Sequence, residues 1–92
     1  MRNPDPITVY SAVIRVGESA ESVSYWIERS RSGNTYSVLR AFGDVGRDPS
    51  IAKDASQCCE IEHTFDAAFR ALRYDIEAVT ARYLSAGLAS VA

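Results

Sequence analysis

Residues 64–86 read TFDAAFRALRYDIEAVTARYLSA, and this stretch decides the fold. At about 100° per residue, its apolar side chains gather within about 60° of one direction on a helix. Thr64 is suited to be the N-cap, Asp66 suits the positive end of the helix dipole, and Gly87 stands at the expected C-terminal cap. One amphipathic helix is therefore predicted from Thr64 to about Ala86. Its buried stripe consists of Phe65, Ala68, Phe69, Leu72, Ile76, Val79 and Tyr83.

Three segments ahead of this helix have the residue pattern of β-strands. Residues 7–16 form a β-branched and aromatic run with apolar side chains on both faces. Residues 23–31 alternate more cleanly, and residues 35–42 follow after the sequence SGN at 32–34. Glycine and asparagine tolerate positive φ, so this sequence is suited to a tight turn. The second and third segments are predicted to form an antiparallel hairpin.

The hydrophobic period is lost from 43 to 57, where glycines and a proline indicate a long loop. Within this loop, Asp48 is predicted to cap a short helical turn that begins at Pro49. A short fourth strand is predicted over residues 58–63, where the side chains alternate again.

The length and composition fit one globular domain. A chain of 92 residues has room for a single core, and 47% hydrophobic with 24% charged residues is ordinary for a folded protein. With a flexible N-terminus at 1–6, we expect residues 1–92 to form one small α+β domain. Its architecture is an antiparallel sheet of three to four strands, in the order β-β-β-(β)-α, with the long C-terminal helix packed on one face.

Charge and hydropathy limit the partners. A formal net charge of -2, from 10 basic and 12 acidic residues, disfavours nucleic acid as a partner. No apolar run approaches the roughly 20 residues of a membrane span, and the N-terminus lacks the apolar core of a signal peptide. Cys58 and Cys59 are adjacent, so a disulfide between them would be strained and a reducing compartment suits them. We therefore expect a cytoplasmic protein without a membrane partner.

The strongest candidate for a catalytic or metal-binding site is the cluster of Cys58, Cys59 and His63. If residues 58–63 are extended, Cys59 and His63 share a face but lie about 13 Å apart, at roughly 3.3 Å per residue. That separation is too long for a Cys–His nucleophile pair, and the paired cysteine spacing of a structural zinc site is missing. The sequence predicts no catalytic, metal or cofactor site. A small Cys-dependent enzyme or redox protein around Cys58 and Cys59 stays an alternative.

A second alternative is a single-stranded nucleic-acid-binding protein that uses basic and aromatic side chains on the sheet. Glu18, Glu21 and Glu28 interrupt the positive field, and the aromatic RNA-recognition motif is missing. Ordinary core aromatics with solvated arginines explain the same residues. The residues concerned are Arg15, Arg29, Arg31, Arg40, Tyr25, Trp26, Tyr36 and Phe42.

Two surfaces favour contact with another protein. If the helix covers the sheet face with Tyr10, Ile14, Tyr25 and Ile27, the far face presents an apolar patch that includes Val9, Val13 and Trp26. The helix side away from the core carries small residues around an aromatic, which permit close approach of another element. Alanine is also the best helix former, which explains the same pattern without a partner. That side carries Ala67, Ala71, Tyr74, Ala78 and Ala81.

The leading prediction is a small non-enzymatic protein-binding module, acting alone or as a homodimer. Small acidic α+β domains of bacterial or phage origin often serve as inhibitors or adaptors, although this likeness is one of architecture only. The partner is another protein, contacted through the far sheet face, the 43–57 loop or the back of the helix. The predicted partner-binding residues are Trp26, Tyr36, Arg47, Asp48, Ala71, Tyr74 and Ala78.

Overall fold

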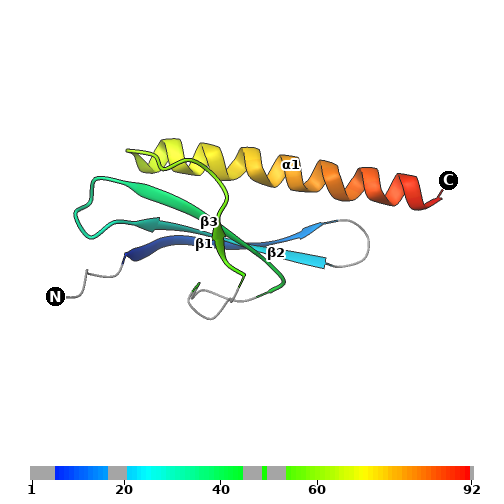
Figure 1. Cartoon of the computed structure of the whole chain (residues 1–92), viewed down its shortest axis with the longest axis horizontal. Helices are drawn as coiled ribbons and strands as arrows, with labels where there is room; N and C mark the ends of the chain where they lie inside the picture. Colours follow the sequence, from blue (N-terminus) through cyan, green and yellow to red (C-terminus); the bar gives the residue numbers. More distant parts are fainter. Residues whose placement is uncertain (1–5, 17–20, 45–48, 50–53, 92) are drawn as a thin grey trace.

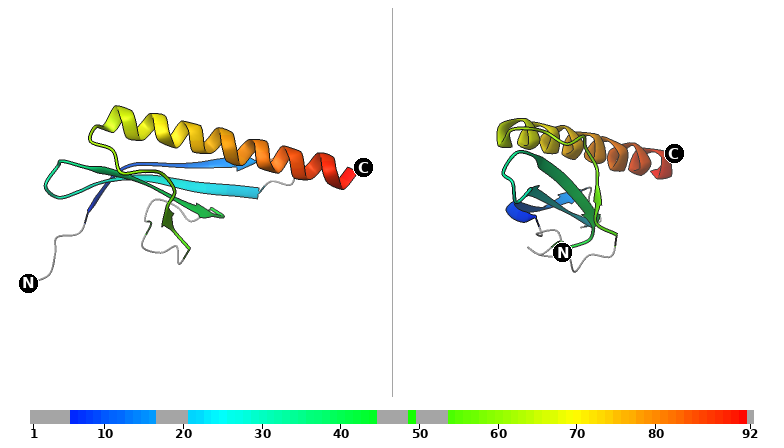
Figure 2. Two further views of the ribbon diagram at one scale, coloured as in Figure 1. Left: turned by 45° about the horizontal axis from the view of Figure 1, so that its top comes forward. Right: turned by 60° about the vertical axis from the view of Figure 1, so that its left-hand side comes forward.

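The computed structural model describes residues 6–16, 21–44, 49 and 54–91 of the chain. Its elements are β1 (Ile7–Val16), β2 (Glu21–Arg29), β3 (Tyr36–Phe42), β4 (Ser56–Gln57) and α1 (Phe65–Val91) (Figure 1). The helix lies along one face of the sheet (Figure 2). The predicted α+β class, an antiparallel sheet followed by one helix on one face, is confirmed.

The strands pair in chain order, β1-β2-β3-β4, and every pair is antiparallel. The β1–β2 register shifts between Thr8 and Tyr10, so Val9 is the extra residue of a β-bulge. From Tyr10 to Val16 the register is unbroken. The side chains of β1 beyond the bulge therefore alternate regularly between the two faces of the sheet.

The predicted hairpin joins β2 and β3. Its turn is closed by a hydrogen bond of 2.9 Å from the Ser30 amide to the Thr35 carbonyl. Gly33 has a φ of 78°, which suits a residue without a side chain. Because the turn begins at Ser30, β2 ends at Arg29. The prediction that this strand extends to residue 31 is therefore wrong.

The fourth strand is shorter and earlier than predicted. β4 covers Ser56–Gln57, inside the expected 43–57 loop, and the strand expected over 58–63 is wrong. Arg40 pairs with Ser56, so an unbroken ladder would place residue 60 opposite Tyr36. Instead, Glu62 forms an isolated bridge with Tyr36. Two extra residues are accommodated between these contacts, and the chain must leave the ladder to accommodate them.

The helix begins as predicted and ends later. The Thr64 hydroxyl accepts a hydrogen bond of 3.1 Å from the Ala67 amide, which is the geometry of an N-cap. The end expected at Gly87 is wrong, because α1 continues to Val91. Glycine permits the left-handed conformation that ends a helix but does not impose it, and the next two residues, leucine and alanine, are good helix formers. No helix in the described ranges is long and apolar enough to cross a membrane.

The core lies between α1 and the sheet. The helix covers the face that carries Tyr10, Ile14, Tyr25 and Ile27, and six of the seven residues of the predicted stripe are confirmed in the core. The side chain of the seventh, Tyr83, lies outside the described residues. The buried cluster consists of Val23, Tyr25, Ile27, Val38, Ala68, Leu72 and Val79, with Phe65, Phe69 and Ile76 packed against it.

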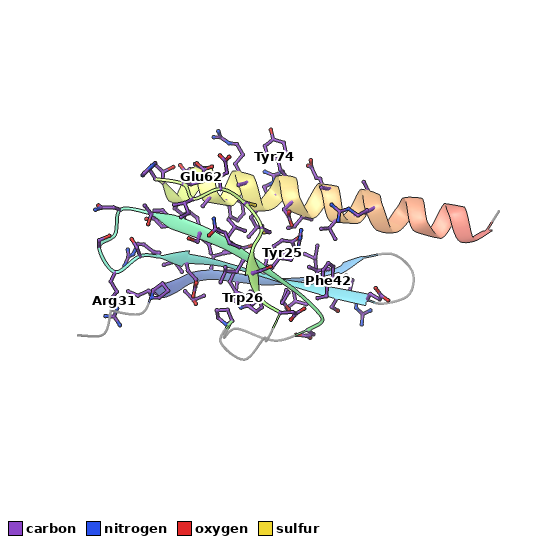
Figure 3. The ribbon with its side chains drawn as sticks, viewed as in Figure 1. Tyr25, Trp26, Arg31, Phe42, Glu62 and Tyr74 are labelled. Carbon is purple, nitrogen blue, oxygen red and sulfur yellow. The ribbon has the colours of Figure 1, made fainter. Side chains whose placement is uncertain are left out.

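The far face of the sheet is less open than predicted. Val13 is 43% exposed, but Trp26 is fully buried although it lies on the side away from α1 (Figure 3). Trp26 sits on an inner strand, with Ser11 and Leu39 as its partners on the two neighbouring strands. The expectation that Trp26 belongs to an exposed apolar patch is therefore wrong.

Candidate functional site

A polar cluster lies between α1 and the sheet, centred on Asp75. This residue stands at the edge of the apolar stripe, three positions after Leu72 and four before Val79. Its side chain is only 13% exposed. Burying an unpaired carboxylate is strongly unfavourable, so a charge at this position requires partners.

Asp75 finds its partners on two adjacent strands. The Tyr25 hydroxyl donates to Oδ2 at 2.7 Å, and Nη1 of Arg40 donates to Oδ1 at 2.9 Å and to Oδ2 at 2.7 Å. Tyr25 and Arg40 are direct cross-strand partners in the β2–β3 ladder. Such partners project from the same face of a sheet, so both donors point toward the helix.

The electrostatics fix the protonation of these donors. Burial raises the pKa of Tyr25 far above its ordinary value, and the hydrogen bond and charge of Asp75 raise it further. Burial lowers the pKa of Arg40, but the hydrogen bond and charge of Asp75 outweigh this and leave it raised. Tyr25 thus stays a neutral donor and Arg40 a cation. Their hydrogen bonds hold the Asp75 side chain in one orientation.

The chain leaving β4 places both cysteines beside this carboxylate. The sulfur atoms of Cys58 and Cys59 are 3.7 Å apart, and both lie within 4.8 Å of a carboxylate oxygen of Asp75. The thiol of Cys58 donates to the Val38 carbonyl at 3.7 Å, and that of Cys59 to the Ala71 carbonyl at 3.6 Å. Adjacent side chains of a strand point to opposite faces. The Cys58 amide still bonds to the Val38 carbonyl at 3.0 Å, so the chain leaves the ladder only after Cys58, and this departure brings the two thiols together.

The thiols are not arranged as nucleophiles. Burial is the main cause that raises the pKa of Cys58 and of Cys59, and the charge of Asp75 raises both further. The thiolate is the reactive form, so a raised pKa disfavours a Cys-dependent enzyme. His63, the single histidine of the sequence, is exposed at the residue before the helix cap and stands outside the cluster.

A second feature is the outer edge of β1. In the part of the chain that the structure describes, β1 pairs with β2 alone. Natural proteins usually protect such an edge with charges, proline or a bulge. Here the bulge at Val9 and the charge of Arg15 flank the stretch Tyr10–Ile14, which contains none of these devices. Val9 and Val13 are 37% and 43% exposed.

A groove of about 490 Å³ runs along one flank of α1. Phe69 on this flank packs edge-to-face against Tyr10 of β1, with ring centroids 5.2 Å apart. The groove therefore lies on the β1 side of the molecule. Tyr74, at its far rim, is 66% exposed. The lining residues are Phe65, Asp66, Phe69, Arg70, Arg73, Tyr74 and Glu77.

The back of the helix is only partly open. Tyr74 and Ala78, both predicted to contact a partner, are exposed. Ala71 is half-buried, because the Cys59 thiol lies against its carbonyl. Whether any of these residues touches a partner stays a prediction.

The other predicted contact residues are less accessible or lie outside the described residues. Tyr36 is half-buried, and its ring lies edge-on to Phe65 with centroids 6.1 Å apart. Trp26 is fully buried. Arg47 and Asp48 lie outside the described residues, whereas Pro49, at which the predicted helical turn begins, has the 3₁₀-helical conformation.

The aromatic and basic residues considered for nucleic-acid stacking do not form a common surface. Tyr25 and Trp26 are fully buried and point to opposite faces of the sheet. Arg40 is paired with Asp75. Phe42 is exposed, with the Arg40 guanidinium 5.7 Å from its ring centroid. This arrangement disfavours stacking of successive bases on the sheet.

The pairing of Asp75 with Tyr25 and Arg40 was not predicted from the sequence, although a signal was present. Asp75 is a charged residue at the edge of the helical stripe, beside Leu72 and Val79, and Arg40 interrupts the alternation between Val38 and Phe42 on the face that packs against the helix. Opposite charges on two surfaces that pack together are expected to pair.

Comparisons of the chain with protein-family models, with curated proteins and with solved structures find no match.

Proposed function

We propose that this chain is a non-enzymatic protein-binding module that pairs with a second copy of itself through the outer edge of β1. The observation that carries the proposal is the stretch Tyr10–Ile14 at that edge. It has no charge, proline or bulge to prevent pairing. Open N–H and C=O groups at the edge of a sheet bind another strand when nothing blocks them.

The composition of this stretch suits pairing with its own copy. In an antiparallel pairing centred on Ala12, Tyr10 of each copy lies opposite Ile14 of the other on the helix-covered face. Aromatic and β-branched residues are favourable cross-strand partners. On the far face, Val13 lies opposite Ser11 of the second copy, which covers apolar surface that is now exposed. A twofold axis through Ala12 satisfies both copies at once.

The groove along α1 extends this surface. It runs above the β1 edge, and a second copy that extends the sheet passes beneath it. Its charged residues are of both signs, namely Asp66, Arg70, Arg73 and Glu77. A mixed polar rim around an apolar centre is typical of contacts between proteins. Because the edge contact is small, we expect a dimer that dissociates on dilution.

The test is sedimentation of the purified chain over a wide range of concentration, with the double variant Val9→Lys, Val13→Lys beside it. Both valines are exposed, so the fold tolerates lysine there, and lysine on an edge strand opposes pairing. The native chain should show a concentration-dependent dimer and the double variant a monomer. The control is Ala78→Lys, which places a single lysine on the exposed back of α1.

A native chain that stays monomeric at every concentration would overturn the proposed dimer, as would a dimer that the lysines at positions 9 and 13 leave unchanged. Loss of the dimer in Ala78→Lys would also overturn the proposed interface, because it would show that the two copies meet through the back of α1. The inhibitor or adaptor role predicted from the sequence requires a different protein at the same edge. A pull-down with the native chain and with the double variant tests for that protein.

A further inference from the structure

We propose that Cys58, Cys59 and Asp75 form a binding site for one thiophilic divalent cation of the Zn²⁺ type, with solvent water as its fourth ligand. The site lies between α1 and the chain that follows β4. It is independent of the β1 edge, so each proposal can fail without the other.

The distance between the sulfur atoms fits a shared cation. Two Zn–S bonds of about 2.3 Å at the tetrahedral angle place their sulfurs about 3.8 Å apart. The Cys58 and Cys59 sulfurs are 3.7 Å apart, so they need almost no movement. A Zn–O bond of about 2.0 Å requires sulfur–oxygen distances of about 3.5 Å. A carboxylate oxygen of Asp75 lies within 4.8 Å of both sulfurs, which is within about 1.3 Å of the distance required.

Hydrogen bonds orient the Asp75 carboxylate in the way that is usual for a metal ligand. Carboxylate ligands are generally oriented by hydrogen bonds from a second layer of residues. Tyr25 and Arg40 supply these bonds, and together they occupy Oδ2 twice but Oδ1 only once. A carboxylate oxygen has two lone pairs, so Oδ1 keeps one free for a cation.

The chain that carries the thiols is also held in place. The Cys58 amide donates to the Val38 carbonyl at 3.0 Å, and the Gln57 side-chain amide donates to the Cys59 carbonyl at 2.9 Å. Cys58, Cys59 and Asp75 are all half-buried, so an ion can reach them while the protein covers part of its surroundings.

The charges balance on binding. Before binding, both thiols are neutral, and Asp75 is compensated by Arg40. Binding releases two protons from the thiols and adds one divalent cation, so the net charge of the cluster stays at zero. No electron is transferred, and no oxidant is required. A disulfide between Cys58 and Cys59 would need an oxidant and an approach of the sulfurs to about 2.05 Å.

The experiment is a titration of the reduced 92-residue chain with Co²⁺, a spectroscopic substitute for Zn²⁺. Because the chain has only two cysteines, thiolate-to-cobalt absorption reports on Cys58 and Cys59 alone. We expect one ion per chain, intense tetrahedral bands, displacement by Zn²⁺ and release of about two protons per ion near neutral pH.

Four variants test the ligand set. Cys58→Ser and Cys59→Ser should each abolish the thiolate band, and Asp75→Asn should weaken binding at least tenfold. If Asp75→Asn fails to fold, Tyr25→Phe keeps the carboxylate but removes a donor that orients it, and a weakening of about tenfold is expected. The control is His63→Ala, which removes the only imidazole and should bind as the native chain does.

The site would be overturned by the absence of a thiolate band with the native chain, by unchanged affinity in folded Asp75→Asn, or by loss of binding in His63→Ala. One ion per two chains would also overturn it, because the cation would then be shared by four thiolates of two copies. The double variant Val9→Lys, Val13→Lys should keep one ion per chain, which separates this site from the proposed dimer.

Discussion

The Tyr25 hydroxyl donates a hydrogen bond of 2.7 Å to Oδ2 of Asp75 and joins β2 to α1 across 50 positions of the sequence. Apolar contacts between a helix and a sheet are not directional, so they allow the helix to slide or rotate. A hydrogen bond to a buried carboxylate allows only one position. Together with the Arg40–Asp75 ion pair, it sets the register of α1 on the sheet.

Tyr25→Phe should destabilise the fold by about 1.5–3 kcal/mol, the usual contribution of a hydrogen bond to a charged group. The ring stays in the core, and only the donor to Asp75 is lost. Urea unfolding followed by fluorescence measures the change, because Trp26 is the only tryptophan and is fully buried. The matched control is Tyr74→Phe on the exposed side of α1, where we expect a change within about 0.5 kcal/mol. Equal effects of both variants would refute the directional role of Tyr25.

The folded chain should lose stability as the pH rises above about 8.5, the pKa of a thiol in an unfolded chain. Burial raises the pKa of Cys58, so in this range the folded state keeps a proton that the unfolded state releases. Stability then falls with increasing pH, by at most about 1.4 kcal/mol per pH unit for each retained proton. Tyr25, whose pKa is also raised, adds to the slope above about pH 10.

Urea unfolding at neutral pH and at about pH 9.5, with a chelator present, measures this dependence. Cys58→Ser removes one titrating group and should show a shallower decline than the native chain. Tyr25→Phe should show the same slope of stability against pH as the native chain up to about pH 9.5. Above about pH 10 its decline should be shallower, which a third measurement at about pH 11 tests. Identical slopes for Cys58→Ser and the native chain would contradict a buried neutral thiol at this position.

Ala71→Arg and Ala78→Arg should differ although both alanines lie on the back of α1. Ala71 is half-buried, and the Cys59 thiol donates to its carbonyl. A larger side chain at this position should crowd the segment that contains Cys59 and lower the free energy of unfolding by about 1–3 kcal/mol. Ala78 is exposed, and its substitution should change stability by less than about 0.5 kcal/mol. Thermal unfolding of the two variants measures the difference, and similar melting temperatures would show that Cys59 does not pack on the helix as described.

The sequence was sufficient to predict the helix stripe and the β2–β3 hairpin, because both arise from local periodicity. Leu72 and Val79 lie on one side of any helix, and Gly33 permits a tight turn wherever it occurs. The position of β4 was not predictable in this way. The side chains of 58–63 alternate, but two extra residues between the contacts to Arg40 and to Tyr36 take the chain out of the ladder.

The candidate site also depends on the chain leaving the β-ladder after β4, which the alternation of side chains does not predict. Cys58 and Cys59 meet Asp75 only once β3, the chain after β4 and α1 are assembled. No spacing in the sequence encodes that meeting, because Asp75 lies 16 positions after Cys59 on a different element. The burial of Trp26 was missed for a related reason: alternation predicts which face a side chain points to, but not what covers that face.

The pairing of strands in chain order has a consequence for synthesis on the ribosome. Each strand finds its neighbour already made, so the sheet is able to assemble before α1 exists. At about 5–20 residues per second, the 27 residues of α1 take about 1–5 s to emerge. During this interval Val23, Ile27 and Val38 have nothing to cover them, and Arg40 has no counter-ion. The arrival of α1 therefore marks the end of the period in which the nascent chain is exposed to chaperones and to aggregation.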